Sequence, residues 1–419
     1  MRRRILAAVL ALGAMAGPGT ASGAEEATLS VSQRAWIASR IYAAVQTYFG
    51  HWRGAPGLDF EQEYRTYLDQ ILAISDRRAF DLATMALIAR LGNGHSGFSD
   101  RWLRETFGQP LGFAARPIDG KWVVTASEVG GLKPGDVVAK IDGKPFEEFA
   151  GSREKYVSAS DERWRHRALF EDPYLFPPAF ALELADGRKV SVIRRGAFRW
   201  PGEDEKEATY REEGDLLLVR VPSFARPHFE AEALAAVRGH SSARAVIVDV
   251  RGNHGGSTPE KLVAALMDRP YRWYAESTPV AVGLFQSLGI VGRRAELAWS
   301  PEVEKPASDG YRGMVLLLVD GGCFSACEDF AVPFKDNHRA LLLGERTAGS
   351  SGQPASLDLG DGMWISLSAK REFLPDGSEF EGRGIAPDVE IPVRAADLSS
   401  GADRVLEEAR RRARQASLR

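Results

Sequence analysis

The sequence predicts an α/β core that follows an N-terminal helical region and a β-rich segment. Residues 30–92 carry apolar side chains at positions i, i+3, i+4 and i+7, which is the spacing of one helix face. Near Leu111 the pattern changes to short apolar runs separated by Asp-Gly turns, which is typical of strands. From Gly214 onward apolar strands alternate with amphipathic helices, and this order favours parallel strand pairing.

The composition is that of an ordinary globular protein. The chain has 419 residues, of which 44% are hydrophobic and 26% charged, enough for two or three domains. With 54 basic and 57 acidic residues, the net charge of −3 gives no electrostatic basis for binding nucleic acid. No run after residue 30 approaches the ~18 apolar residues of a membrane span, and no cluster has metal-ligand spacing. We therefore expect no stable membrane span, no metal and no cofactor.

The first residues have the pattern of a secretory signal. "MRRR" is followed by the apolar block "ILAAVLALGAMA" and then by small residues. A mitochondrial presequence is the alternative, but the compact apolar block fits it poorly. We expect cleavage after Ala24 and an exported protein, either periplasmic or secreted.

The predicted helical region ends in a loop that carries a histidine. "QRAWIASRIYAAVQTYF" and "DLATMALIARLG" predict helices, and the glycine-rich "GNGHSGFSD" with His95 follows them. The division that we expect is a signal peptide (1–24), an N-terminal helical region (25–100), a β-rich domain with a helical insertion (101–197) and an α/β core (198–419).

The β-rich segment resembles a PDZ domain, which is a peptide-binding module. "EVGGLKPGDVVAKIDGKPFEEF" is similar to the middle of such domains, and "PLGF" lies where they keep their carboxylate-binding loop. The resemblance implies that Leu111, Gly112 and Phe113 bind the C-terminus of a peptide, which adds as a strand to the sheet edge. The apparent helical insertion at residues 151–178 interrupts the pattern before the late strands.

Ser325 lies between an apolar run and a helix start. "MVLLLVD" predicts a buried strand, and "SACEDFAVPF" begins like a helix with acids in its first turn. A helix N-cap is a common role for such a serine. A nucleophile at a strand-to-helix turn is the alternative, because the next N–H, that of Ala326, would then point out of the helix start.

The two cysteines of the chain, Cys323 and Cys327, flank this serine. An oxidising compartment and a four-residue spacing permit a disulfide. We favour the alternative, two small side chains packed beside the site.

A second loop supplies glycines at the end of another predicted strand. "VIVDVRGNHGGSTPEKL" places Gly252, Gly255 and Gly256 between a buried strand and a helix. Glycines let the backbone approach a reacting group, so that their N–H groups can bind an oxyanion. No Gly-Lys-Ser/Thr follows, which argues against a nucleotide loop.

Four segments occur in an order that resembles a known family. "VDVRGNHGG", "VDGGCFSACEDF", "GERTAGSSG" and "EGRGIAPDVEI" are similar to the motifs of carboxyl-terminal processing proteases and tricorn-core proteases. The resemblance implies a crotonase-like (ClpP/crotonase) core and endopeptidase activity. It implies that Ser325 is the nucleophile and that Ala326, with Gly255 or Gly256, supplies the oxyanion donors.

The resemblance also bears on the base. Processing proteases use a lysine, but in "GERTAGSSG" Ser350 stands at that position, and Lys370 lies outside the motif. The tricorn-like branch uses a histidine in a turn similar to "LGNGHSGF", which implies His95 as base. His254, inside the glycine loop, is the alternative base. The remaining histidines are expected at the surface or in packing: His51, His166, His228, His240 and His338.

Two carboxylates complete the predicted site. Glu381 matches the glutamate that orients the histidine in the tricorn-like branch, and Glu328 is a possible auxiliary one helical turn after Ser325. An imidazole base predicts an acidic limb of the rate profile with a pKa of roughly 6–7. A non-catalytic ligand- or peptide-binding protein on the same fold is the alternative function. The retained serine, the glycine loop and the "GNGH" turn favour the enzyme.

Overall fold

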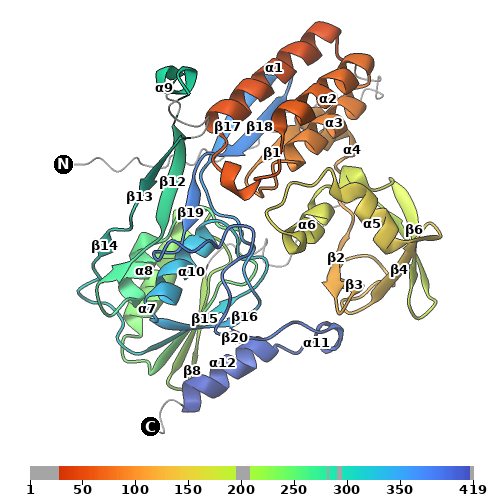
Figure 1. Cartoon of the computed structure of the whole chain (residues 1–419). Helices are drawn as coiled ribbons and strands as arrows, with labels where there is room; N and C mark the ends of the chain where they lie inside the picture. Colours follow the sequence, from red (N-terminus) through yellow and green to blue (C-terminus); the bar gives the residue numbers. More distant parts are fainter. Residues whose placement is uncertain (1–27, 195–207, 281–282, 290–294, 416–419) are drawn as a thin grey trace.

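The computed structural model of the chain describes residues 28–194, 208–280, 283–289 and 295–415. The predicted signal peptide and its cleavage site lie outside these ranges. Among the described residues, no helix combines the length and apolar composition that crossing a bilayer requires. Figure 1 shows an N-terminal helical layer, a β-rich unit and a C-terminal α/β unit packed side by side.

The N-terminal region forms the predicted helices. Ser30, Asp59 and Asp76 cap them, each accepting a hydrogen bond from a backbone N–H of the first turn. The helices are α1 (Val31–Tyr48), α2 (Phe60–Ala73) and α3 (Arg77–Ala89). After α3, β1 (Gly97–Asp100) pairs antiparallel with β18 (Met363–Ser368), so this region shares a sheet with the C-terminal part of the chain.

The β-rich unit is an antiparallel sheet in the order β2-β3-β4-β6-β7, entered through α4 (Arg101–Phe107). Its strands are β2 (Phe113–Ile118), β3 (Lys121–Ser127), β4 (Val137–Ile141), β6 (Ala179–Leu184) and β7 (Lys189–Ile193), and β5 (Lys144–Pro145) pairs with β4. The insertion expected at residues 151–178 is helical: it begins within α5 (Phe146–Glu154) and contains α6 (Glu162–Ala168). β2 is an edge strand, and α6 packs against it.

The C-terminal unit contains the predicted parallel sheet, in the order β20-β16-β15-β10-β9-β8. All its neighbours pair in parallel except β8 with β9. The strands are β8 (Thr209–Glu213), β9 (Leu216–Arg220), β10 (Ala245–Asp249), β15 (Met314–Val319), β16 (Ala340–Gly344) and β20 (Val389–Glu390).

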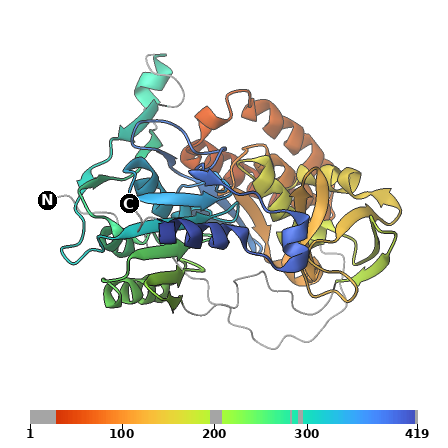
Figure 2. The ribbon, with the colours of Figure 1, turned by 90° about the horizontal axis from the view of Figure 1, so that it is seen from below.

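Helices cover both faces of this sheet, because alternate side chains of a strand point to opposite faces. Val246 and Val248 pack in one core with α7 (Pro227–Gly239), α8 (Glu260–Leu266) and α10 (Ala326–Asp336). Ala245 and Ile247 pack in another core with α12 (Arg404–Gln415), which lies in front of the sheet in Figure 2 and follows α11 (Ala395–Ser400). The central strands β10 and β15 have five and six residues and are buried on both faces, which explains their continuous apolar runs.

Smaller β elements join the main units. The sheet β13-β12-β19 contains β12 (Ala275–Val280), β13 (Ala295–Trp299) and β19 (Arg371–Phe373), and Figure 1 shows the β12–β13 arm with α9 (Gly283–Ser287) projecting from the body. The short strands β11 (Tyr271–Arg272) and β14 (Val303–Glu304) pair with each other, and β17 (Pro354–Gly360) pairs with β18 in the sheet β1-β18-β17. The loops that follow β10, β15 and β16 carry three of the four motifs, and parallel pairing brings them to one edge of the sheet.

Candidate active site

Ser325 lies at the turn between β15 and α10 with φ 57° and ψ −126°, a backbone conformation that is costly for a residue other than glycine. Its N–H donates to Ser350 O at 3.0 Å, and its carbonyl accepts from the N–H groups of Glu328 and Asp329. Its side chain forms no capping hydrogen bond to the helix. Backbone hydrogen bonds therefore hold Ser325 in a strained conformation, and its hydroxyl does not cap the helix.

Cys323 and Cys327 form a disulfide across this turn. The expectation of two packed, unpaired cysteines was wrong. The turn folds the chain back on itself, so that the two Cα atoms are 5.3 Å apart, a distance that suits a disulfide. Both residues are fully buried, and the bond encloses Ser325 in a short loop.

The glycine loop lies directly against this turn. A Cβ atom added to Gly255 would lie 2.8 Å from both Ser325 Cβ and Ala326 N, so only glycine fits. Gly255 N–H donates to Asn253 Oδ1 at 2.8 Å and is therefore not available as an oxyanion donor. In the described part of the chain, the N–H groups of Ala326 and Gly256 donate to no protein acceptor. These two remain the candidate oxyanion donors.

His95 follows α3 and approaches the turn from the N-terminal region. Its ring stacks on Phe324 with centroids 4.4 Å apart, and its Nδ1 lies 2.9 Å from Ser350 Oγ. Burial, and then the nearby His51, lower the pKa of His95 to about 3, so its imidazole is neutral near pH 7. Across the described ranges, no hydrogen bond joins His95 to Ser325.

Ser350, at the position of the processing proteases' lysine, links the turn to the imidazole. Its carbonyl accepts from Ser325 N–H, its hydroxyl contacts His95, and its own N–H donates to Glu328 Oε2 at 2.7 Å. Glu328 also accepts from Thr347 Oγ1 and Gly349 N–H. Glu328 thus supports the loop that carries Ser350. Burial raises the pKa of Glu328 to about 7.

Glu381 was expected to orient His95, but among the described residues it has no hydrogen bond to that ring. Its carboxyl accepts from Ser351 N–H at 3.2 Å and lies 3.8 Å from Nδ1 of His51. The Nδ1 edge of His95 is already occupied by the Ser350 hydroxyl. Burial, and then two neighbouring carboxylates, raise the pKa of Glu381.

His51, which the sequence interpretation assigned to the surface or to packing, is buried beside this carboxyl group. Its Nε2 lies 2.7 Å from Lys370 O and 2.8 Å from Ser368 Oγ. No local motif marks His51, because its neighbours come from the distant segment that contains β18. Sequence reasoning had no signal for it.

The alternative bases have other partners. His254 Nε2 lies 2.6 Å from an Arg167 nitrogen, and because a guanidinium can only donate, this imidazole nitrogen accepts. Its lone pair is therefore occupied. Lys370 Nζ pairs with Glu372 at 2.6 Å and with Glu276, and these charges, which outweigh burial, keep its pKa above the usual value. Neither group can accept a proton from Ser325 in this arrangement.

The expected peptide-binding loop leads into the edge strand β2. Leu111 and Phe113 are buried, and Gly112 has φ 81°, a conformation that favours glycine. Gly112 O accepts from Glu128 N–H at 2.8 Å. The backbone of this loop is therefore fixed beside the β2 edge.

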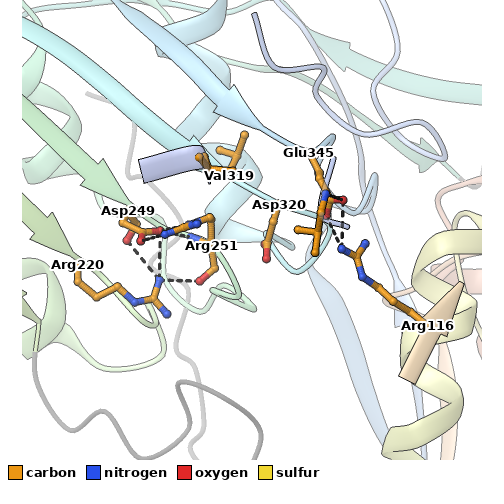
Figure 3. A pocket seen from close by; sticks show the side chains of 9 residues that line it. Arg116, Arg220, Asp249, Arg251, Val319, Asp320 and Glu345 are labelled. Atoms are coloured by element: carbon orange, nitrogen blue, oxygen red, sulfur yellow. Dashed lines mark hydrogen bonds and ion pairs between the residues drawn. The ribbon is translucent and has the colours of Figure 1, made fainter. Parts of the chain in front are cut away.

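A cavity of about 300 Å³ lies at the carboxyl ends of the parallel strands, between the core and β2 (Figure 3). The charged side chains that line it form ion pairs, Arg116 with Glu345 and Arg251 with Asp249. Neither Ser325 nor any other predicted site residue lines it. Among the described residues, no group of three His, Cys, Asp or Glu side chains could hold a metal ion.

Comparisons with curated proteins find serine proteases. A "Probable CtpA-like serine protease" of Staphylococcus epidermidis (strain ATCC 12228 / FDA PCI 1200) is 24% identical over 275 residues, which are 63% of this chain and 48% of that protein. Its counterpart from Staphylococcus haemolyticus (strain JCSC1435) is 22% identical over 272 residues, with the same shares. The chain spans about half the length of these curated relatives.

Solved structures share the fold, and a family profile matches the core. Mature CPAF superposes with a TM-score of 0.68 at 16% identity, over 88% of this chain and 94% of that chain. The photosystem II D1 C-terminal processing protease gives 0.54 at 20% identity, over 86% and 93%. Residues 215–391, which include Ser325 and Glu381, match the profile of Peptidase family S41. Over these residues the chain is similar to peptidase family S41.

Proposed function

We propose that the protein is an exported serine endopeptidase that cleaves peptides or unfolded proteins. Its core is crotonase-like, and the β-rich unit is a PDZ-like domain. The match of residues 215–391 to peptidase family S41 supports catalysis over the alternative of a non-catalytic binding protein. The observation that carries the proposal is the strained turn at Ser325, whose side chain does not cap the helix and which lies against Gly255.

In the proposed reaction, Ser325 Oγ attacks the carbonyl carbon of the scissile bond and His95 Nε2 accepts the proton. The N–H groups of Ala326 and Gly256 bind the oxyanion. His95 then protonates the leaving amine, and a water molecule, activated by the same imidazole, hydrolyses the acyl-enzyme. Substrate binding brings Ser325 and His95 into contact, since catalytic hydrogen bonds often form only in the complex.

The tricorn-like use of histidine is part of the proposal. It is supported by the ion-paired state of Lys370 and by the short distance between His95 and Ser350. Peptides enter by their C-termini, with Leu111, Gly112 and Phe113 holding the carboxylate through backbone N–H groups while the chain adds to β2.

The test is cleavage of a denatured protein mixture, with the new termini mapped by mass spectrometry. Wild-type protein should generate new termini, and Ser325→Ala should lose activity by several orders of magnitude while its melting temperature is retained. An active Ser325→Ala variant would refute the assignment of the nucleophile.

A further inference from the structure

An aromatic stack connects α6 to the catalytic turn. The Trp164 indole, 6% exposed, stacks on Phe324 with centroids 4.3 Å apart and planes at 17°. The other face of Phe324 stacks on His95 at 4.4 Å and 15°. Phe324 therefore lies between the Trp164 indole and the His95 imidazole, and it directly precedes Ser325 in the chain. A side chain of the β-rich unit, Trp164, is thus separated from the imidazole by one aromatic ring.

Polar groups of the same segment hold the surrounding loops. Ser160 Oγ accepts from the N–H of Gly94, which precedes His95, at 2.9 Å. Arg163 donates to Thr347 O at 3.0 Å, in the loop that carries Ser350, and to Arg383 O at 3.1 Å, in the loop that carries Glu381. Arg167, one helical turn after Trp164, donates to His254 in the glycine loop.

The opposite face of α6 belongs to the β-rich unit. His166 lies edge-on to Trp122 of β3, with centroids 5.1 Å apart, and its Nε2 is 3.3 Å from Glu154 of α5. α6 also packs against β2. The helix is therefore anchored on the sheet through one face, while the other face contacts catalytic loops from two different parts of the chain.

We infer that residues on and just before α6 form a clamp that assembles the active site, with Trp164 as its positioning residue acting through Phe324 on His95. The members of this clamp are Ser160, Arg163, Trp164 and Arg167. The inference rests on the proposed peptidase function. It makes the β-rich unit part of the active site, in addition to any role in holding a peptide C-terminus. Activity on substrates too short to reach β2 therefore also depends on α6.

The test compares Trp164→Leu, which stays apolar but is smaller and cannot stack, with Trp164→Phe, which can stack. Activity is measured on a short fluorogenic peptide, per active site titrated with a fluorophosphonate. Trp164→Leu should lower kcat about threefold to tenfold, which corresponds to losing the interaction energy of one aromatic pair. KM should change less than kcat, and Trp164→Phe should restore most of the rate.

The pH profile separates positioning from packing. The titratable groups that act on the pKa of His95 are His51, Glu372 and Lys370, and these three lie outside α6. Loss of the indole admits water beside Phe324 and His95, which weakens the effect of burial on the His95 imidazole. The acidic limb of kcat/KM should therefore move to higher pH in Trp164→Leu. A variant that melts earlier but keeps the wild-type kcat and acidic limb would overturn the inference and leave the peptidase proposal standing.

Arg163→Gln tests the clamp without touching the apolar core, because Arg163 is a half-exposed side chain. It should lower kcat by about threefold, the scale of roughly one net hydrogen bond, at an unchanged melting temperature. Glu162→Gln, an exposed neighbour that faces His166 on the same helix, is the matched control and should leave kcat unchanged. Equal rates for Arg163→Gln and wild type would count against the clamp. If the wild-type protein is not labelled by the fluorophosphonate and does not cleave the peptide, the proposed function and this inference are both overturned.

Discussion

At the scale of single residues, Ser350 determines which nitrogen of His95 can act as the base. If Nδ1–H donates to the Ser350 hydroxyl at 2.9 Å, Nε2 carries the free lone pair. In the proposed mechanism, Ser350 thus orients the base and does not itself accept the proton. A neutral hydroxyl stabilises the imidazolium less than a carboxylate would, so positioning is its main contribution.

Ser350→Ala should therefore lower kcat by about 10-fold to 100-fold, because the buried Nδ1–H loses its acceptor and the ring loses its fixed tautomer. KM should change little. Steady-state kinetics on a fluorogenic peptide checks this, with Ser356→Ala, whose exposed hydroxyl lies 3.1 Å from that of Ser366, as the control. Wild-type kcat in Ser350→Ala would show that the contact is incidental.

The pH profile should differ from that of a solvent-exposed imidazole. Burial, His51 and Lys370 lower the pKa of His95 to about 3, while Glu372 opposes them. The sequence expectation of roughly 6–7 therefore shifts downward. A base with a depressed pKa stays unprotonated as the pH falls, so kcat/KM should stay level from about pH 7.5 to about pH 5. An acidic limb centred near 6.5 would contradict the buried, neutral state of His95.

At the scale of elements, the β15–α10 turn holds a strained serine between two cysteines. Ser325 is fixed by backbone hydrogen bonds, by the loop after β16 and by the Cys323–Cys327 bond. Together these contacts offset the cost of the positive φ angle. α10 follows immediately, so the N–H of its first residue, Ala326, lies beside the proposed nucleophile, Ser325.

The disulfide should raise the free energy of unfolding by a measurable amount. Replacing both cysteines with alanine should lower the free energy of unfolding by about 2 kcal/mol, the entropy of a loop of about five residues. Denaturant unfolding measures this, and thiol titration of the unfolded, unreduced protein should find no free thiol. Two titratable thiols in protein purified without reductant would contradict the bond.

At the scale of the whole molecule, the parts of the proposed site come from three regions of the chain. His95 follows the N-terminal helices, Ser325 lies in the core, and Trp164 belongs to the β-rich unit. The β1–β18 pairing fixes the first region to the core, since it joins Gly97, two residues after His95, to Ser366. The site therefore forms only when all three regions have folded together.

Local patterns predicted the elements better than the contacts between them. Apolar runs such as Val246–Val250 identify the parallel strands because burial on both faces leaves no alternation. The β1–β18 pairing has no local signal, since its register is set by residues more than two hundred positions apart. β12 was missed because its "AESTPV" is half polar and contains a proline. His51 and the disulfide depend on how distant segments and one tight turn pack.

The most direct measurement is the rate at which a fluorophosphonate labels the protein, with the labelled residue identified by peptide mapping. The label should attach to Ser325, and His95→Gln should slow labelling by about 10³-fold or more, because the two residues act as one unit. His254→Gln should slow it far less, since His254 holds Arg167. Fast labelling of His95→Gln, or a label on a residue other than Ser325, would contradict the serine–histidine assignment.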